Sequence, residues 1–333
     1  MTKGLTERKI IELILSRIEE APQMTIPFGD DVSAVEIGNN LVAVLKTDML
    51  VACTDVPPGM SFWQAARKAV VMNVSDFAAK GVKPKALLVS LGIPERLTDE
   101  NIIGQIVEGL NAGAREYGAY ILGGDTNEAC DLIIACMLYG TAKKDAVISR
   151  CGAKPGEIVA VTGLFGRTAA GLKVLLENFE ASEDIREKLV DSVLMPRARL
   201  NEGLALAEAG VASASIDSSD GLAWSLHELS KASNVGFEID VVPLAPEAKK
   251  FAERHGLDPI ELCFYGGEEY ELVVTVKPEL WKKAQKTVEK AGGKLIRIGK
   301  TIKEKKIYLK FKNRIIPLEA RGWEHFRRGR KDD

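Results

Sequence analysis

Apolar and polar positions along the chain predict a mixed α/β fold. Apolar residues recur at helical spacing from Phe62 to Lys80, and Asp99 is placed to cap a second helix that runs to about Tyr117. Short apolar runs predict strands at residues 34–37, 41–48, 86–92, 119–122 and 132–140. With an amphipathic first helix, these elements make a first α/β unit.

The second half repeats the mixture with different elements. It predicts strands at 157–163, 214–216, 237–242, 271–276 and onward to 311, and helices at 222–232, 246–255 and 278–291. A length of 333 residues exceeds what one core usually covers, so we expect two domains with a cleft between them. We place an N-terminal α/β domain at residues 1–142, a linker at 143–156 and a C-terminal α/β domain at 157–333.

Composition narrows the class of protein. Hydrophobic residues make up 46% of the chain and charged residues 28%, which is typical of soluble globular proteins. A net charge of -2 with both signs mixed gives no field that recruits nucleic acid or a membrane surface. Charged residues interrupt the first apolar stretch, so we expect neither a signal peptide nor a membrane span, and a cytoplasmic location.

Cysteine and histidine contents exclude several kinds of site. The five cysteines contain no C-x-x-C pair, and the three histidines are scattered, so a zinc site, a disulfide framework and a histidine triad are all disfavoured. Any metal here needs oxygen ligands.

Aspartates recur where predicted strands stop. The strand patterns LVAVLKTD, AYILGGD and SASIDSSD end at Asp48, Asp125 and Asp220, with Asp217 inside the last. Asp30 and Asp31 precede another strand, and Asp76 lies on the long helix. Because ligands of α/β sheets collect outside the carboxyl ends of strands, these side chains are placed where a site would form.

Convergent aspartates require cations. At an effective dielectric of about 20, each like-charged pair about 4 Å apart costs roughly 4 kcal/mol. Only Lys46 and Arg150 lie close in sequence to these motifs, so the pattern favours Mg²⁺, which usually accompanies phosphates. Each aspartate taken alone is equally well a turn residue, and Asp76 with Lys80 is also an ordinary helical pair.

Two ways of binding phosphate remain without a P-loop, which the sequence lacks. The turn from Gly163 to Gly166 follows a strand and precedes a helix, so it could accept phosphate, although a plain tight turn is the simpler interpretation. Phosphate binding would otherwise depend mainly on metal ions together with Arg150, whose planar guanidinium suits phosphate oxygens.

Taken in order, a set of motifs resembles the thiamine-monophosphate kinases, which form one superfamily with aminoimidazole ribonucleotide synthetase and selenophosphate synthetase. The motifs span nearly the whole chain and are Gly29-Asp30-Asp31, Thr47-Asp48, Asn73-Val74-Ser75-Asp76, Gly123-Gly124-Asp125-Thr126, Ser149-Arg150-Cys151-Gly152-Ala153, Met195-Pro196-Arg197, Asp217-Ser218-Ser219-Asp220-Gly221-Leu222, Gly266-Gly267-Glu268-Glu269-Tyr270-Glu271-Leu272 and Gly322-Trp323-Glu324-His325-Phe326.

The resemblance implies roles for these residues. Several magnesium ions would be held by Asp30, Asp31, Thr47, Asp48, Asp76, Asp125, Asp217 and Asp220. ATP would contact Gly124, Asp125, Arg150 and Ser219, and thiamine monophosphate would contact Asp55, Glu268 and Trp323. It also implies a two-domain α/β architecture like that of aminoimidazole ribonucleotide synthetase, with N-terminal sheets pairing in a homodimer. No catalytic base is expected, because a phosphate monoester is already an adequate nucleophile.

The sequence departs from the common bacterial pattern at three points. Asp55 and Val56 stand where many bacterial members have His-Phe, which resembles the archaeal branch. Glu269 replaces the usual aspartate of Gly-Glu-Asp-Tyr, and Arg167 with Thr168 replaces a common Asp-Ser.

Three alternatives to this activity remain. One is the ATP-dependent cyclo-ligase of purine synthesis, which is not known for the terminal Gly-Trp-x-His-Phe. Selenophosphate synthetase is weaker, because it usually has a reactive Cys or selenocysteine early in the chain and the first cysteine here is Cys53. The third is a noncatalytic regulator that binds a nucleotide or divalent cations with the same aspartates.

Overall fold

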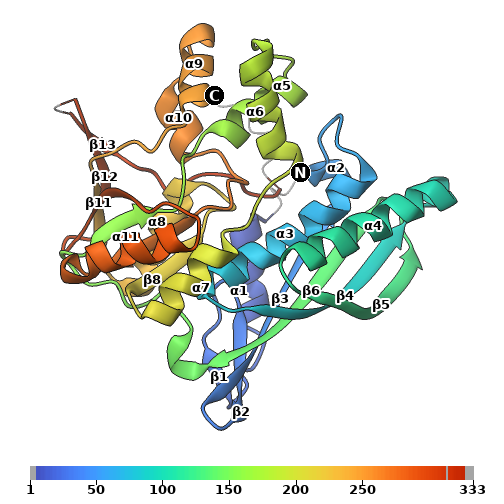
Figure 1. Cartoon of the computed structure of the whole chain (residues 1–333), viewed down its shortest axis with the longest axis horizontal. Helices are drawn as coiled ribbons and strands as arrows, with labels where there is room; N and C mark the ends of the chain where they lie inside the picture. Colours follow the sequence, from blue (N-terminus) through green and yellow to red (C-terminus); the bar gives the residue numbers. More distant parts are fainter. Residues whose placement is uncertain (1–4, 313, 327–333) are drawn as a thin grey trace.

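The chain folds into two sheets that lie side by side, with helices packed on each (Figure 1). The structure is a computed structural model that describes residues 5–312 and 314–326. Within these residues a six-stranded sheet has the order β1-β2-β3-β6-β4-β5, and a seven-stranded sheet has the order β13-β12-β9-β11-β7-β10-β8. The expected mixed α/β class, with its two packed units, is confirmed.

The first half of the chain supplies the six-stranded sheet. Its strands are β1 (Met24–Ile26), β2 (Ser33–Gly38), β3 (Leu41–Val51), β4 (Pro84–Ile93), β5 (Tyr120–Glu128) and β6 (Ile133–Lys143). Its helices are α1 (Glu7–Leu15), α2 (Ala52–Asp55), α3 (Phe62–Lys80) and α4 (Glu100–Glu116), with short 3-10 turns at Glu95–Leu97 and Lys144–Ala146. Only β4 and β5 run parallel; the other neighbours are antiparallel.

The second half supplies the seven-stranded sheet. Its strands are β7 (Ile158–Val161), β8 (Ala212–Asp217), β9 (Gly236–Ile239), β10 (Leu272–Val276), β11 (Ile296–Ile302), β12 (Ile307–Phe311) and β13 (Arg314–Pro317). Its helices are α5 (Arg167–Leu176), α6 (Glu183–Leu194), α7 (Leu200–Ala209), α8 (Leu222–Ser233), α9 (Pro246–His255), α10 (Pro259–Phe264) and α11 (Trp281–Lys290), with a 3-10 turn at Pro278–Leu280.

Helix α3 joins the two halves. Ser61 and Gln64 form a capping box at its start, and Gly81 ends it in the left-handed conformation with φ 64°. The helix contacts α4, β3 and β6 of the first half and α7 and β8 of the second, and nearly its whole length is buried. The close approach of α7 requires Gly203, where an added Cβ would lie 1.9 Å from the carbonyl oxygen of Ala78. One apolar core, built around α3, therefore extends under both sheets.

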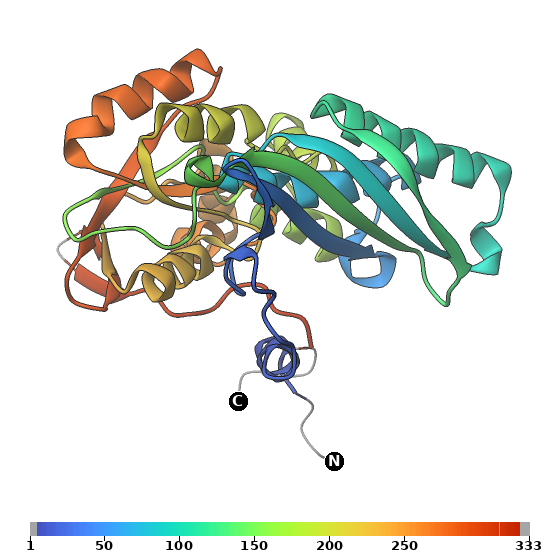
Figure 2. The same cartoon turned by 90° about the horizontal axis from the view of Figure 1, so that it is seen from below.

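Helix α1 stands away from the two sheets (Figure 2), and residues near the end of the described chain contact it. Its side chains are all at least partly exposed, including Ile11 and Ile14. The helix is held by polar contacts: Glu7 Oε2 accepts the backbone N–H of His325 at 2.9 Å. None of the helices in the described part of the chain is long and apolar enough to cross a membrane.

Two strands run past the aspartates at which we expected them to end. β3 continues beyond Asp48 to Val51, because Met49 to Val51 pair with β6, and β5 continues beyond Asp125 to Glu128 along β4. Of the three patterns, only the last leaves aspartates at a strand end: Asp217 closes β8 and Asp220 lies just after it. The prediction that Asp48 and Asp125 stand at strand ends is therefore wrong.

Candidate active site between the two sheets

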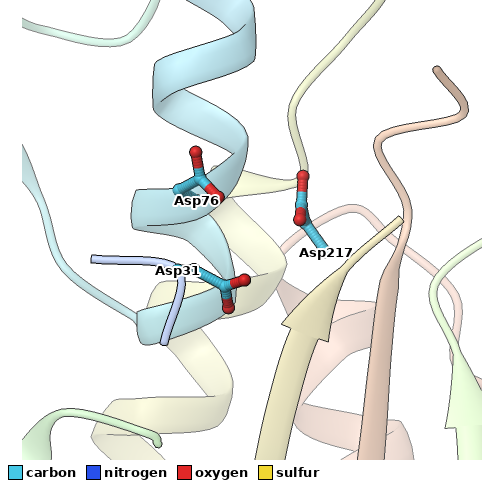
Figure 3. A group of neighbouring side chains, drawn as sticks. All are labelled: Asp31, Asp76 and Asp217. Carbon is cyan, nitrogen blue, oxygen red and sulfur yellow. The ribbon is translucent and has the colours of Figure 1, made fainter. Parts of the chain in front are cut away.

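Three aspartates from distant parts of the chain converge beside α3. Asp31 comes from the loop before β2, Asp76 from α3 and Asp217 from the end of β8 (Figure 3). One carboxylate oxygen of each lies within 4.8 Å of the others, and all three residues are buried. Their convergence is what the sequence led us to expect.

Two polar residues of α3, Asn73 and Ser75, each form a hydrogen bond to a strand that borders the site. Asn73 Oδ1 accepts the backbone N–H of Asp48 at 2.9 Å, which fixes β3 against α3. Ser75 Oγ donates to Asp217 Oδ2 at 2.8 Å, which fixes the end of β8. Asp76 then lies between the two. One helix therefore brings ligands from both halves of the chain together.

Asp30 and Asp31 are already compensated by cations of the chain itself. Lys80, whose side chain is fully buried, places Nζ 2.6 Å from Asp30 Oδ1 and 2.7 Å from Asp31 Oδ2. Arg150 donates through Nε to Asp31 Oδ1 at 2.9 Å, and its Nη2 pairs with the same oxygen. Burial raises the pKa of Asp31, but Arg150 and Lys80 outweigh burial and lower it to about 2.

Lys80 does not form the helical pair with Asp76 that its spacing allows; it pairs with Asp30 and Asp31 instead. Asp30 is further occupied by the hydroxyl of Ser149 at 2.9 Å and the N–H of Arg150 at 3.0 Å, both to Oδ2. Asp30 is thus bound by protein donors on both oxygens and lies outside the group of three. Its assignment as a metal ligand stays a prediction.

Lys46 is the cation that faces Asp76. Its Nζ lies 2.9 Å from Asp76 Oδ2 and 3.2 Å from Asp48 Oδ1. Because successive side chains of a strand point to opposite faces, Lys46 and Asp48 share one face of β3, and the exposed Thr47 side chain lies on the other. The structure therefore does not bring the Thr47 side chain to the group of three.

Negative charge is in excess at the remaining carboxylates. Burial, followed by the charge of Asp31, raises the pKa of Asp217 to about 7. Burial and the nearby Glu7 raise the pKa of Asp220 to about 6, and burial raises that of Asp76 well above its ordinary value despite Lys46. A bound cation would stabilise the ionised forms of these three carboxyl groups and lower their pKa values.

A cavity of about 280 Å³ opens next to these aspartates. It is lined by Gly29, Arg150, Asp217, Ser219, Asp220, Trp224, Glu228, Trp323 and residues of α1. Two of the expected ATP contacts, Arg150 and Ser219, lie on its wall. Arg8 also lies there, with its guanidinium carbon 3.4 Å from the ring centre of Trp224 and Nη1 2.7 Å from Glu228 Oε1. Sequence reasoning missed Arg8 and Trp224, which belong to no motif that we recognised.

The loop after β8 positions two of the expected acceptor contacts. Ser219 O accepts the N–H of Glu268 at 2.6 Å, and Asp220 O accepts the N–H of Trp323 at 3.0 Å. Glu268 adopts a left-handed conformation with φ 62°, which is uncommon for a residue with a side chain. The backbone after Asp217 therefore holds Glu268 and Trp323 next to the aspartates through these two hydrogen bonds.

Lys68 connects the remaining acceptor residue to Glu268. Its buried Nζ lies 2.5 Å from Glu268 Oε1 and donates to Asp55 O at 2.9 Å. The carboxylate of Asp55 turns back to accept the N–H of Val51 at 2.7 Å. Sequence reasoning missed Lys68; a lysine on the inner face of a long apolar helix was the available signal.

Gly124 and Asp125 lie across the six-stranded sheet from Asp48, and Asp125 is not a member of the group of three. Asp48 pairs with Cys136 on β6, Cys136 with Val89 on β4, and Val89 with Gly124 on β5. Three strand spacings of about 4.8 Å therefore separate Asp48 from Gly124, or roughly 14 Å. Asp125 is exposed on β5, the last strand of its sheet.

The turn from Gly163 to Gly166 is occupied by the chain itself. Glu269 Oε1 accepts the N–H of Gly166 at 2.5 Å and of Thr168 at 3.2 Å, so a carboxylate sits at the N-terminus of α5 where phosphate was considered. Burial raises the pKa of Glu269 to about 7, in spite of these two donors. The simpler interpretation of this turn, without a bound phosphate, fits the structure.

Family models match both halves of the chain. The model described as "AIR synthase related protein, N-terminal domain" matches residues 29–142, and the one described as "AIR synthase related protein, C-terminal domain" matches residues 154–312. The chain therefore has the two-domain architecture of the AIR synthase related proteins.

Individual relatives are more specific. The chain is 36% identical to the thiamine-monophosphate kinase of Nitrosopumilus maritimus, covering 90% of this chain and 93% of that protein. It is 36% identical to that of Pyrococcus horikoshii, covering 98% of each. The structure of AaThiL complexed with AMPPCP and TMP matches with a TM-score of 0.84 at 29% identity, covering 98% of each chain. The chain belongs to the thiamine-monophosphate kinase family.

Proposed function

We propose that this protein transfers the γ-phosphoryl group of ATP directly to thiamine monophosphate and so forms thiamine diphosphate. The observation that carries the proposal is the convergence of Asp31, Asp76 and Asp217 beside a cavity whose wall holds Arg150 and Trp323, in a chain of this family. The motifs that indicated the family from sequence supply these residues.

The residues present suit Mg²⁺. Asp31, Asp76 and Asp217 offer only oxygen ligands, which a hard cation prefers, and the raised pKa values of Asp76 and Asp217 indicate that their negative charges lack full compensation. Further carboxylates are close: Asp48 shares Lys46 with Asp76, and Asp220 follows Asp217 by three residues. When bound there, Mg²⁺ would neutralise phosphate charge during the transfer.

The other residues bind and orient the two substrates. Arg150 and Ser219 face the cavity and would contact the phosphates of ATP, although Arg150 also holds Asp31 and Gly29 O. Trp323 is 48% exposed and lines the cavity, where it would stack on the cationic thiazolium or the pyrimidine. Glu268 can accept a hydrogen bond from the aminopyrimidine, and Lys68 orients it. Asp55 is placed less directly, because its carboxylate caps Val51.

We infer that the active form is a homodimer in which Asp125 and Gly124 act on the site of the other subunit. Within one chain Gly124 lies three strand spacings, roughly 14 Å, from Asp48, and Asp125 is exposed. The same sheet exposes large apolar side chains that a second copy would cover, including Met49, Leu88 and Leu122, of which Leu122 is 73% exposed. A cytoplasmic location and the lack of a nucleic-acid partner stay predictions.

An acceptor panel tests the function. Purified protein with ATP and Mg²⁺ is offered thiamine monophosphate, free thiamine and the formylated amidine substrate of the purine cyclo-ligase, and ADP release is followed for each. We expect turnover with thiamine monophosphate alone. Turnover with the amidine would favour the cyclo-ligase, and tight nucleotide binding without turnover of any acceptor would favour the regulator.

A further inference from the structure

Lys46 places a positive charge inside the aspartate cluster. Its Nζ lies between Asp76 Oδ2, at 2.9 Å, and Asp48 Oδ1, at 3.2 Å. Two carboxylates that approach one point from different elements, here α3 and β3, are the arrangement that otherwise holds a divalent ion. At this point the chain supplies the cation itself.

Lys80 shows what a purely structural lysine looks like in the same cluster. Its side chain is 0% exposed, and its Nζ is surrounded by Asp30, Asp31 and Ser215 O, the last at 2.8 Å. Three partners match the three donors of an ammonium, so Lys80 has none left for a substrate.

Lys46 differs from Lys80 in its number of partners and in its exposure to solvent. Among the described residues the ion pairs of its Nζ are two, with Asp48 and Asp76, and its side chain is 20% exposed. The Asp48 side chain beside it is 35% exposed, so solvent reaches this side of the cluster. One N–H of Lys46 can therefore reach a ligand oxygen while the other two hold the carboxylates.

We propose that Lys46 is a resident cation of the active site: it takes the position of one metal ion between Asp48 and Asp76 and donates to the phosphoryl group in transfer. The proposal rests on the function proposed above. In that transfer an oxygen of the acceptor phosphate forms a bond to the γ-phosphorus while the bond to the β–γ bridging oxygen breaks, and ADP leaves with that electron pair. Lys46 keeps its proton throughout and offsets charge on the transferred group.

A consequence is that the chain needs one metal ion fewer than a site with a neutral residue at this position. Removing the ammonium leaves Asp48 and Asp76 facing each other without their cation, and a divalent ion can enter. An arginine at the same place keeps the charge and excludes the extra ion.

Counting bound Mn²⁺ tests the inference without relying on turnover. Wild type, Lys46→Ala and Lys46→Arg are titrated with Mn²⁺ in saturating AMPPCP, and free Mn²⁺ is measured by electron paramagnetic resonance. We expect Lys46→Ala to bind one ion more per subunit than wild type, and Lys46→Arg to match wild type. Lys143→Ala, which removes an exposed lysine at the end of β6, is the matched control. Equal counts in wild type and Lys46→Ala would overturn the inference.

Two further readouts separate this inference from the proposed function and from misfolding. The melting temperature of Lys46→Ala should rise more on adding Mn²⁺ than that of wild type; an unchanged response contradicts the inference even if the count is disturbed by partial unfolding. If thiamine monophosphate is no substrate for wild type, the proposed function fails, whereas the ion count with AMPPCP still decides the position of Lys46.

Discussion

Ser75 donates its hydroxyl to Asp217 across 2.8 Å, and this bond joins helix α3 of the first half to strand β8 of the second. It sets the distance between Asp76 and Asp217, on which a shared metal ion would depend. Ser75→Ala removes the donor from a buried carboxylate, which costs about 1.5–3 kcal/mol for a hydrogen bond to a charged group. We expect Mg²⁺ affinity to fall about 10- to 100-fold, as measured by isothermal titration.

The matched control is Ser182→Ala, which removes an exposed hydroxyl just before α6. It should bind Mg²⁺ as wild type does. Unchanged affinity in Ser75→Ala as well would mean that Asp217 holds its position without this bond, and would weaken the case for a metal shared between the two halves.

The acceptor residues should affect one substrate and not the other. Trp323→Ala removes a ring contact worth roughly 0.5 to 2 kcal/mol, or about a 2- to 30-fold loss in affinity for thiamine monophosphate. Glu268→Gln should act in the same direction and also leave Lys68 without its carboxylate partner. Isothermal titration with thiamine monophosphate and with AMPPCP, in saturating Mg²⁺, compares the two ligands. If both variants bind thiamine monophosphate as tightly as wild type, the acceptor has been assigned wrongly.

The roughly 14 Å between Asp48 and Gly124 gives a test of the dimer. If Asp125 serves the other subunit, Asp125→Asn and Asp76→Asn are each inactive, but mixed dimers contain one site with both aspartates intact. After unfolding and refolding an equal mixture, half of the dimers are mixed and about a quarter of all sites should be complete. An assay before and after mixing measures this. No recovery, in dimers shown to have exchanged, would place Asp125 in its own subunit's site or in none.

Glu269 should give the protein a dependence of stability on pH. Its pKa is about 7 in the folded state against an ordinary 4.5, so the folded protein binds this proton more tightly and loses stability as pH rises from about 4.5 to 7. Glu269→Gln loses no proton, so it should gain up to about 3 kcal/mol on wild type across that window. Urea unfolding at several pH values measures the difference. Glu253→Gln, at an exposed position, should run parallel to wild type; a parallel curve for Glu269→Gln would contradict the burial argument.

The sequence predicted most elements and the convergence of aspartates, because caps and apolar spacing are local properties. Ser61 and Gly81 cap α3, which begins and ends where the sequence predicted. Asp31, Asp76 and Asp217 come together as their motifs suggested. Sequence reasoning failed where partners lie far apart in the chain. The spacing of Asp76 and Lys80 allowed a helical pair, but Lys80 is 49 to 50 residues from the aspartates that it contacts.

The register and the order of the strands could not be predicted from the sequence either. A run such as AYILGGD does not reveal that β4 continues beside it and draws Asp125 into the strand. Nor does it reveal how many strands separate Asp125 from Asp48. Lys46 was noted only as a cation near the motifs, and Lys68 was overlooked, for a related reason. Their roles follow from which carboxylates face them, and this depends on the packing of α3 against β3 and the loop at Glu268.

The central claim is that the buried aspartates support direct phosphoryl transfer to thiamine monophosphate, and phosphorus NMR of one reaction mixture tests it most directly. With ATP, Mg²⁺ and thiamine monophosphate, wild type should produce thiamine diphosphate and ADP in equal amounts, without free phosphate, and none of either after chelation of Mg²⁺. Asp76→Asn should produce neither while keeping the circular dichroism spectrum of wild type, because the amide has the size and shape of the buried carboxyl; the exposed Asp145→Asn is its control. Wild-type product formation by Asp76→Asn, or ADP with free phosphate in place of thiamine diphosphate, would contradict the account.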